Sequence, residues 1–212
     1  MADPADFIRE HLPVLPVPGL SAIRLHQAAP ASGIGRLAGP DGPPYWAYRW
    51  AGGLALARHI VDRPEHVAGR RVLDLGTGSG LVAIAAARAG ANSVVATDVD
   101  AHAIAACRLN AVLNGVAIEP IHRDLTDDAP PAVDVVLVGD LFYSADLAAR
   151  VSSFLDRCVD AGIVAIVGDP WRATLPIDRL REIARYQVAE AGVAKPSGVF
   201  IYTAGKVGRV AL

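Results

Sequence analysis

The sequence predicts an α/β fold with a doubly wound, mainly parallel sheet. From residue 71 to residue 168, short apolar runs typical of buried strands alternate with helix-forming stretches. Glycines at positions 76, 78 and 80 join the first of these strands directly to a helix. Acidic residues also lie at the carboxyl ends of three strands, as Asp74, Asp98 and Asp140. In such a sheet this rim is where ligands bind.

Composition limits the classes of protein. The chain has 212 residues, of which 52% are hydrophobic and 20% charged, so we expect one domain over residues 1–212. Within it, residues 1–50 form an N-terminal extension with a lid-like segment, and residues 51–204 form the core. The net charge of −2 favours neither nucleic acid nor an acidic surface as a partner. With two cysteines and neither a C-x-x-C nor an H-E-x-x-H motif, no metal site is expected.

The N-terminal region is expected to hold a short helix, an extended segment and a short strand, followed by a loop. Residues 4–12 fit a short amphipathic helix, after which three prolines keep the chain extended, and residues 23–26 fit an edge strand. Residues 28–44 are expected to be a loop. No apolar run is long enough for a membrane span and the first residues are acidic rather than signal-like, so we expect a cytoplasmic protein without a membrane partner.

An aromatic segment precedes the first sheet strand. Residues 45–50 contain four of the twelve aromatic residues of the chain, and a helix follows over residues 54–61, before Pro64. The segment is either a lid over a ligand or a small aromatic core. For Trp50 the two interpretations have equal support, whereas for Tyr45 the core interpretation is favoured.

The glycine-rich turn points to a particular kind of nucleotide ligand. The strand Val72–Leu75 leads into G-x-G-x-G, and Leu81 occupies the place of the third glycine in a dinucleotide fingerprint. Asp74 stands two residues before Gly76, where a carboxylate disfavours phosphate but tolerates an ammonium or sulfonium group. The stretch resembles motif I of the class I S-adenosylmethionine (SAM) methyltransferases, which have a Rossmann-like fold. The alternative is an ordinary strand-to-helix turn.

The next strands supply further candidate ligand contacts. Asp98 ends a strand over residues 93–98, where a carboxylate can accept both ribose hydroxyls, while Asp100 suits the N-cap of a helix over residues 101–114. A third strand over residues 116–122 contains Pro120, which favours an edge position. Just beyond it, Asp124 or the Leu125 N–H could meet the adenine edge, although a surface turn is an equal alternative for Asp124.

The C-terminal half completes the predicted sheet. Strands are expected over residues 133–139 and 162–168, with helices over residues 145–160 and 177–184. Residues 186–190 and 199–203 alternate like half-exposed strands and should form an antiparallel hairpin joined by a Gly/Lys/Pro turn. Five parallel strands and this hairpin make a seven-stranded sheet.

These motifs together resemble one family. The chain is similar to the electron-transfer-flavoprotein β-subunit lysine methyltransferases, in the family-16 group of seven-β-strand enzymes. The resemblance extends from about Pro44 to Thr203 and rests on four segments: PYWAYRWAGG at 44–53, VLDLG at 72–76, LVGDLFY at 137–143 and GDP at 168–170. It implies methylation of protein lysines with SAM and without a metal. The family's D-x-x-Y motif corresponds to Asp140 and Tyr143.

Motif and resemblance together define the predicted site residues. Asp140 and Tyr143 are the predicted catalytic residues, and Phe142, Tyr143 and Trp171 the predicted substrate-binding residues. Trp171 departs from the small residue expected after Gly-Asp-Pro, which leaves the exact protein substrate open. The predicted cofactor-binding residues are Trp50, Asp74, Gly76, Thr77, Gly78, Gly80, Asp98, Val99, Asp124, Leu125 and Asp140.

Lysine chemistry suggests roles for these residues. A lysine amine attacks only when it is neutral, and apolar walls from Trp50, Phe142 and Trp171 would favour that form by desolvation. Asp140 would bind and orient the lysine rather than act as a strong base. Structural alternatives are an N-cap of the following helix for Asp140, a ring packed beneath the loop for Tyr143, and hydrophobic cover for Trp171.

Other functions remain alternatives. The electron-transfer-flavoprotein β subunit is the expected protein substrate, with a ribosomal protein or a small amine as alternatives. A non-catalytic SAM-binding module would not need acids at three successive strand ends. A nicotinamide dehydrogenase is disfavoured by Asp74 and Leu81. Nucleic-acid-base and glutamine methyltransferases carry two prolines where this chain has Leu141 and Phe142.

Overall fold

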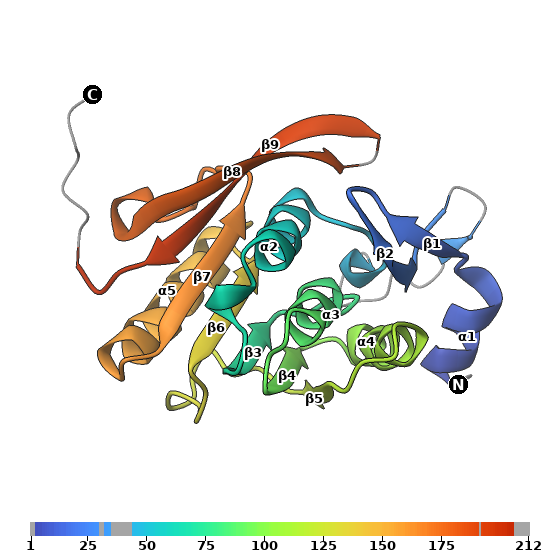
Figure 1. Ribbon diagram of the computed structural model, residues 1–212, viewed down its shortest axis with the longest axis horizontal. Coiled ribbons are helices and arrows are strands. Elements are labelled where there is room, and N and C mark those ends of the chain that lie inside the picture. Colours follow the sequence, from blue (N-terminus) through green and yellow to red (C-terminus); the bar gives the residue numbers. More distant parts are fainter. Residues whose placement is uncertain (1–2, 30–31, 35–43, 191, 206–212) are drawn as a thin grey trace.

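The computed structural model describes residues 3–29, 32–34, 44–190 and 192–205, and its centre is a seven-stranded sheet (Figure 1). The strand order is β5-β4-β3-β6-β7-β9-β8. The first five strands of this order are parallel, and β9 and β8 are antiparallel additions, which confirms the predicted fold class. The strands are β3 (Arg71–Leu75), β4 (Ser93–Asp98), β5 (Glu119–His122), β6 (Val135–Gly139), β7 (Val164–Asp169), β8 (Leu180–Glu190) and β9 (Val193–Tyr202).

Helices cover the two faces of the sheet and enclose separate apolar layers. Helices α2 (Ala51–Asp62), α3 (Leu81–Arg88) and α4 (Ala101–Leu113) lie on one face, and α5 (Ala145–Asp160) lies on the other. Successive residues of a strand point to opposite faces, so Val72 packs with α2 and α3 while Leu73 packs with α5. This two-sided burial explains why the central strands are continuous apolar runs.

The N-terminal region is more ordered than its sequence suggests. Helix α1 (Pro4–His11) agrees with the predicted helix. Strands β1 (Val14–Val17) and β2 (Leu20–His26) pair as a separate antiparallel sheet, so the predicted extended segment has a partner. Asn110 of α4 and Asn114, the C-cap residue of that helix, accept hydrogen bonds from the backbone N–H groups of His26 and Arg24 at 2.8 and 3.0 Å. These amides fix the N-terminal sheet against the core.

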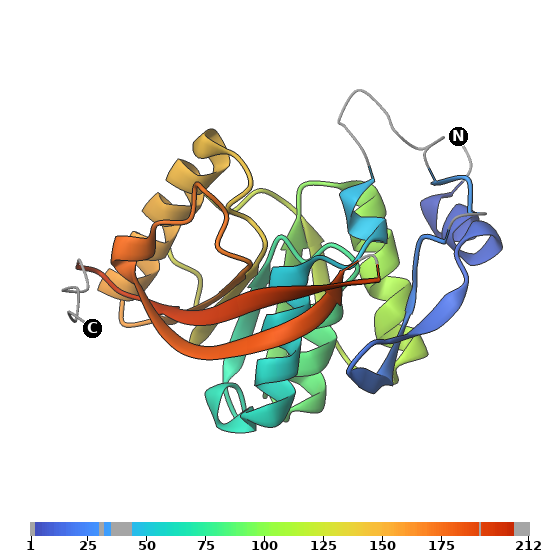
Figure 2. The same cartoon turned by 90° about the horizontal axis from the view of Figure 1, so that it is seen from above.

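The C-terminal hairpin is longer than predicted, and the helix predicted over residues 177–184 is wrong. One 3₁₀ turn covers Ile177–Arg179, after which Leu180 already belongs to β8 and pairs with Tyr202. Pairing along the hairpin outweighs the local helical pattern. Pro196 lies in the part of β9 that extends beyond β7, since the pairing of β9 with β7 begins only at Gly198. A proline is tolerated there because its missing N–H is not needed for pairing with β7. Figure 2 shows the hairpin crossing over α2.

Neither a membrane-spanning helix nor a cluster of potential metal ligands is found among the described residues. No helix in the described part of the chain is long and apolar enough to cross a membrane. The same residues contain no group of three or more potential metal ligands. Both cysteines are buried and unpaired, and Cys107 packs in the core as expected for a small apolar residue.

Candidate cofactor and substrate site

Four acidic residues gather at the carboxyl-end rim of the sheet. Asp74 lies in β3, Asp98 ends β4 and Asp169 ends β7, and Asp140 directly follows β6. The parallel register places Leu75 beside both Thr97 and Val138, and Gly139 beside Gly168. The strand ends are therefore level. The three acids expected at the rim are brought together, and Asp169 joins them.

The glycine loop between β3 and α3 requires its glycines. Gly76, Gly78 and Gly80 have φ values of 68°, 52° and 86°, in the left-handed region that side chains disfavour. A Cβ at Gly80 would also lie 2.9 Å from Cys107 Sγ. Gly76 and Gly78 are partly exposed, whereas Gly80 is buried. The Leu141 side chain lies over Gly76, because a Cβ there would be 2.6 Å from Leu141 Cδ2. Such a loop can accommodate a ligand close to its backbone.

Asp74 stabilises this loop from below. Its Oδ2 accepts hydrogen bonds from the Thr77 hydroxyl at 2.6 Å and from the Ala83 N–H at 3.0 Å. Burial raises the pKa of Asp74 to about 7, although these hydrogen bonds oppose the shift. Both contacts are within the protein, so Asp74 and Thr77 shape the loop, and direct contact of either residue with a cofactor stays a prediction.

Asp98 connects the glycine loop to β4 and retains acceptor capacity. Its Oδ2 accepts from the Gly78 N–H at 2.8 Å, and its Oδ1 accepts from the Asp100 N–H at 3.0 Å. Two such donors do not saturate a carboxylate, which offers about four acceptor positions. Burial raises the pKa of Asp98. Two ribose hydroxyls could donate hydrogen bonds to the remaining positions of Asp98. The acceptors at the rim therefore fit the ribose of SAM. Asp100 caps α4 through the His102 N–H, as expected.

The predicted adenine contacts fall into two groups. Val99 is 66% exposed beside Asp98 and is free to flank a ligand. Asp124, by contrast, accepts hydrogen bonds from Thr126 and forms an ion pair with Arg150. Partial burial opposes the effect, yet these partners lower the pKa of Asp124. The structure therefore favours the surface-turn interpretation for Asp124. Leu125 packs against the α5 side of the core, and a role for its N–H stays a prediction.

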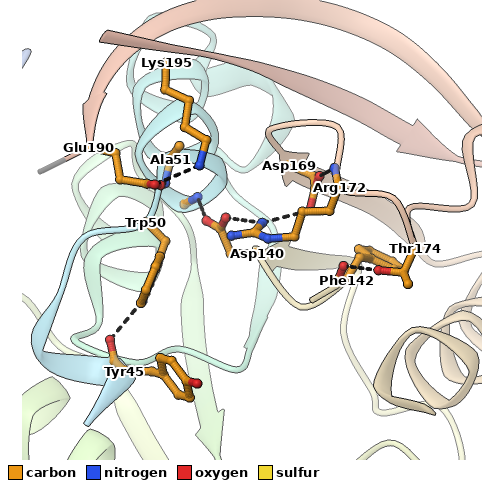
Figure 3. Close-up of polar contacts among 11 residues, drawn as sticks. Tyr45, Trp50, Ala51, Asp140, Phe142, Asp169, Arg172, Thr174, Glu190 and Lys195 are labelled. Atoms are coloured by element: carbon orange, nitrogen blue, oxygen red, sulfur yellow. Dashed lines mark hydrogen bonds and ion pairs between the residues drawn. The ribbon is translucent and has the colours of Figure 1, made fainter. Parts of the chain in front are cut away.

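A three-residue ionic cluster joins the ends of β6 and β7 (Figure 3). Arg172 contacts Asp140 Oδ1 at 2.5 Å and Asp169 Oδ2 at 3.0 Å through the same guanidinium nitrogen. Asp169 is fully buried and Asp140 is 8% exposed. Burial raises the pKa of both carboxyl groups, and the charge of Arg172 opposes that shift. When both carboxyl groups are ionised, the cluster carries one negative charge in excess.

Asp140 also binds the N-terminus of α2. Its Oδ2 accepts from the Gly53 N–H at 2.5 Å, where the helix dipole favours a negative charge. The following helix, α5, is capped by Ser144 instead, which accepts from Leu147. Asp140 therefore does not cap the following helix, as the predicted alternative had it, but binds the N-terminus of α2, 87 residues earlier in the chain.

Glu190 is a second carboxylate on the same helix end. Its Oε2 accepts from the Ala51 N–H at 2.7 Å, and its Oε1 accepts from Lys195 at 2.8 Å (Figure 3). Glu190 ends β8 and Lys195 lies in β9, so the tip of the C-terminal hairpin is fixed beside Trp50, the N-cap residue of α2.

The aromatic segment divides into one buried and several exposed rings, and a lid role of the exposed rings stays a prediction. Trp46 is 5% exposed and packs with α1 and α4, which is the core interpretation. Tyr45 and Tyr48 are instead 51% and 45% exposed, so the core interpretation of Tyr45 is wrong. Trp50 is half-buried, and its indole Nε1 donates to the Tyr45 carbonyl at 2.9 Å. The rings of Tyr45 and Trp50 thus lie at the rim.

The residues predicted to bind substrate are not equally accessible. Phe142 is fully buried in the core on the α5 side, so its side chain does not form the predicted substrate wall. Tyr143 is 59% exposed, which contradicts a ring packed beneath the loop. Trp171 packs edge-on against Phe200 with 5.8 Å between ring centroids, and the Arg185 guanidinium lies 4.4 Å from the Trp171 ring centroid. These contacts favour hydrophobic cover for Trp171.

Sequence reasoning missed Arg172 and Glu190 as site residues. A signal existed for Arg172, since a basic residue directly follows Asp169-Pro170-Trp171 at a rim of acids. The backbone φ values of Asp140 (61°) and Trp171 (59°) are unusual for these residue types, and such strain concentrates at functional sites. Glu190 carried no signal, because its contact depends on how the hairpin crosses α2.

Comparisons with known proteins agree with this geometry. Residues 59–149 match the family "Ribosomal protein L11 methyltransferase (PrmA)". The electron transfer flavoprotein beta subunit lysine methyltransferase of Rattus norvegicus is 39% identical over 160 residues, 74% of this chain and 62% of the rat protein. The Xenopus laevis protein of the same name is 37% identical over 199 residues, 89% of this chain and 80% of that protein. The chain thus spans about three fifths of the rat protein.

A solved structure supports the fold. The ribosomal protein L11 methylase from Lactobacillus delbrueckii subsp. bulgaricus has a TM-score of 0.54 and 26% identity, over 70% of this chain and 76% of that chain. The rim described above therefore lies in a scaffold shared with a protein methylase.

Proposed function

This chain belongs to the family of electron transfer flavoprotein beta subunit lysine methyltransferases, and we propose that it transfers methyl groups from SAM to lysine side chains of a protein. The observation that carries the proposal is the placement of Asp140 and Tyr143, the D-x-x-Y pair, at the same rim as the glycine loop and Asp98. A non-catalytic SAM-binding module would need the glycine loop and Asp98 but would have no need for Asp140 and Tyr143 beside them.

The glycine loop and Asp98 are proposed to hold the cofactor. SAM supplies a methyl group on a positively charged sulfur, which a neutral amine can attack directly. Gly76, Gly78 and Gly80 would border it with bare backbone, and Asp98 would accept hydrogen bonds from the ribose. The exposed side chain of Val99 would flank the adenine, and the Leu125 N–H would meet its edge.

The ionic cluster is proposed to receive the lysine. One excess negative charge attracts an ammonium to the rim, while the Arg172 guanidinium and the cofactor sulfonium both favour loss of its proton there. Asp140 is held by Arg172 and by Gly53, so its orientation is fixed before the lysine arrives. We propose that Asp140 aligns the amine and that catalysis depends mainly on this alignment.

The electron-transfer-flavoprotein β subunit is the proposed substrate, because the two relatives reported above carry that name. A ribosomal protein is a second candidate, which the L11 methyltransferase family match over residues 59–149 favours.

The test incubates the purified chain with SAM and either the purified β subunit or purified ribosomes, followed by mass spectrometry of peptides. Methyl groups on lysines of the β subunit are expected with the parent protein, and none with Asp98→Ala. Methylation of a ribosomal protein alone would overturn the proposed substrate, and methylation of lysine in neither sample would overturn the proposed activity.

A further inference from the structure

Four aromatic side chains form an exposed cluster at the rim: Tyr45, Tyr48, Trp50 and Tyr143, called the aromatic cluster below. The ring centroids of Tyr45 and Trp50 are 5.7 Å apart, those of Tyr45 and Tyr143 are 6.1 Å apart, and those of Tyr48 and Trp50 are 6.3 Å apart. Each of the three tyrosines is at least 45% exposed. A gathering of exposed aromatic rings in a folded protein indicates a binding surface.

The cluster is held in place by its buried neighbours. Trp46, next to Tyr45, is buried against α1 and α4, and Phe142, next to Tyr143, is fully buried in the core. The indole N–H of Trp50 is engaged by the Tyr45 carbonyl, which fixes one ring relative to the other. The rings are therefore exposed although their backbones are anchored, a pre-organised arrangement that lowers the entropy cost of binding.

The cluster lies beside both halves of the proposed site. Tyr143 follows Asp140 by three residues and is close enough to Asp98 for that carboxylate to raise its pKa, after the larger effect of burial. Tyr45 precedes Trp46, whose Cα would lie 3.7 Å from a Cβ at Gly78 of the glycine loop. The rings thus border the space between the cofactor loop and the ionic cluster.

We propose that the aromatic cluster is a cation-binding cage for the target lysine, in its unmethylated and methylated forms, with Tyr45 as a further substrate-binding residue. The proposal rests on the proposed function. Aromatic faces attract ammonium groups through their quadrupoles and do not need N–H donors, so this attraction persists when methyl groups replace the N–H groups. A hydrogen bond to Asp140, in contrast, weakens with each N–H that is lost.

The cage and the ionic cluster therefore have separate tasks. Because aromatic faces favour the charged form of the lysine, the cage contributes to docking and to retention between transfers, and not to deprotonation. Tyr143 is 59% exposed, so its ring remains available to a cation.

The test measures binding directly and needs no protein substrate. Protein saturated with S-adenosylhomocysteine is titrated with Nα-acetyl-Nε-trimethyl-lysine amide and, separately, with its neutral analogue in which a tert-butyl group replaces the trimethylammonium group. NMR chemical shifts report binding. We expect the charged probe to bind about threefold to tenfold more tightly than the neutral probe of the same shape.

Two variants at Tyr45 make the test specific. Tyr45→Leu should reduce the preference for the charged probe at least about twofold, while Tyr45→Phe, which keeps the ring, should retain it. The affinity for S-adenosylhomocysteine should stay within about twofold of the parent in both. Equal affinity of the parent for the two probes, or an unchanged preference in Tyr45→Leu, would overturn the cage. A preference observed without any lysine methylation of the β subunit or ribosomes would instead overturn the proposed function alone.

Discussion

Asp140 connects three parts of the molecule through one carboxylate. It contacts Arg172, the N-terminus of α2 and, in the proposed function, the incoming lysine. Substituting an aspartate with asparagine usually distinguishes two roles of the carboxylate, because the amide can still cap a helix but carries no charge for a substrate. Here the amide also weakens the ion pair with Arg172, so a loss of activity alone would not identify the role. The neighbouring Asp169 provides the comparison, because it contacts the same guanidinium nitrogen and is fully buried.

Asp140→Asn should lower methyl transfer by at least about 10²-fold, the effect of a lost positioning contact, with little change in SAM affinity. Asp169→Asn, the matched control, removes an equal charge from Arg172. Both variants should lose about 1–3 kcal/mol of stability, since a buried charge loses one partner and keeps the other. Turnover, SAM affinity and urea unfolding of both variants decide the matter. An equal loss of turnover in Asp169→Asn would mean that the structure or the charge of the whole cluster, and not alignment of the lysine by Asp140, accounts for the effect.

His59 provides a pH-dependent contribution to stability. It is 3% exposed, its Nε2 has no hydrogen-bond partner among the described residues, and its Nδ1 lies 3.3 Å from the Tyr186 hydroxyl. Burial, followed by the charges of His66 and Arg63, lowers the pKa of His59 to about 4, although Asp62 and Glu65 oppose the shift.

The unfolded chain therefore binds more protons than the folded chain between about pH 6.5 and pH 4. This contribution is complete above pH 6.5 and is lost as the pH falls, by about 2 kcal/mol at pH 4.5. Burial raises the pKa of Asp74 and Asp98, which act in the opposite direction. The comparison of parent and His59→Phe in urea unfolding at several pH values isolates His59. A stability difference between the two proteins that is independent of pH would contradict the assignment.

Helix α2 approaches the sheet unusually closely. A Cβ at Gly52 would lie 2.3 Å from the Gly168 carbonyl oxygen, and a Cβ at Gly168 would lie 2.3 Å from the Gly52 oxygen. Gly139 would similarly meet the Gly53 Cα at 3.0 Å. This backbone-to-backbone packing is what allows the N-terminus of α2 to reach Asp140. Gly52 and Gly53 thus contribute to the site, because their close packing on the sheet determines how near Trp50 and the Gly53 N–H lie to the rim.

Substitutions of the two neighbouring glycines should have opposite outcomes. Gly52→Ala should destabilise the protein by about 1–3 kcal/mol, since backbone atoms of β7 would have to move. At Gly53 an added Cβ meets only ordinary contacts, 3.6 Å from Asp140 and 4.0 Å from Val82. Gly53→Ala should therefore keep the parent stability or gain up to about 1 kcal/mol from helix propensity. Thermal unfolding of both variants provides the measurement, and similar Tm values for the two would refute the packing argument.

The predictability of the elements follows their physical origin. Strands β3, β4, β6 and β7 are recognisable because burial on both faces makes them continuous apolar runs. Pro120 correctly indicated that β5 lies at an edge. The hairpin was recognisable as alternating strands, but its length was not, because residues 180–184 become a strand only through pairing with β9. Pairing between distant residues leaves no local pattern in sequence.

The candidate site follows the same division. Asp74, Asp98 and Asp140 were located at the rim because strand ends can be predicted, and the glycine loop because its conformation demands glycine. The partners of Asp140 could not be predicted, since Arg172 and Gly53 are 32 and 87 residues away from it in sequence. The burial of Phe142 and the exposure of Tyr45 depend on side-chain packing against α5 and α4. Resemblance to a family located the D-x-x-Y pair, and its roles stay proposals.

At the scale of the whole molecule, SAM should stabilise the fold selectively. The glycine loop, with Asp74 before it and Leu81 after it, favours a ligand without a diphosphate. At a concentration of about 100 times its Kd, SAM should raise the Tm by about 5–10 °C, since a bound ligand stabilises only the folded state. NAD and ATP at the same concentration should leave the Tm unchanged. An equal shift with NAD would contradict the cofactor assignment.

The chemical identity of the methylated product tests most directly whether this protein transfers a methyl group to lysine. The purified chain is incubated with radiolabelled SAM and a cell lysate treated with nuclease, and the labelled protein is hydrolysed to amino acids. We expect label in Nε-methylated lysine with the parent protein, and no label with Asp98→Ala. Label in methylated glutamine or in nucleosides, with none in lysine, would contradict it.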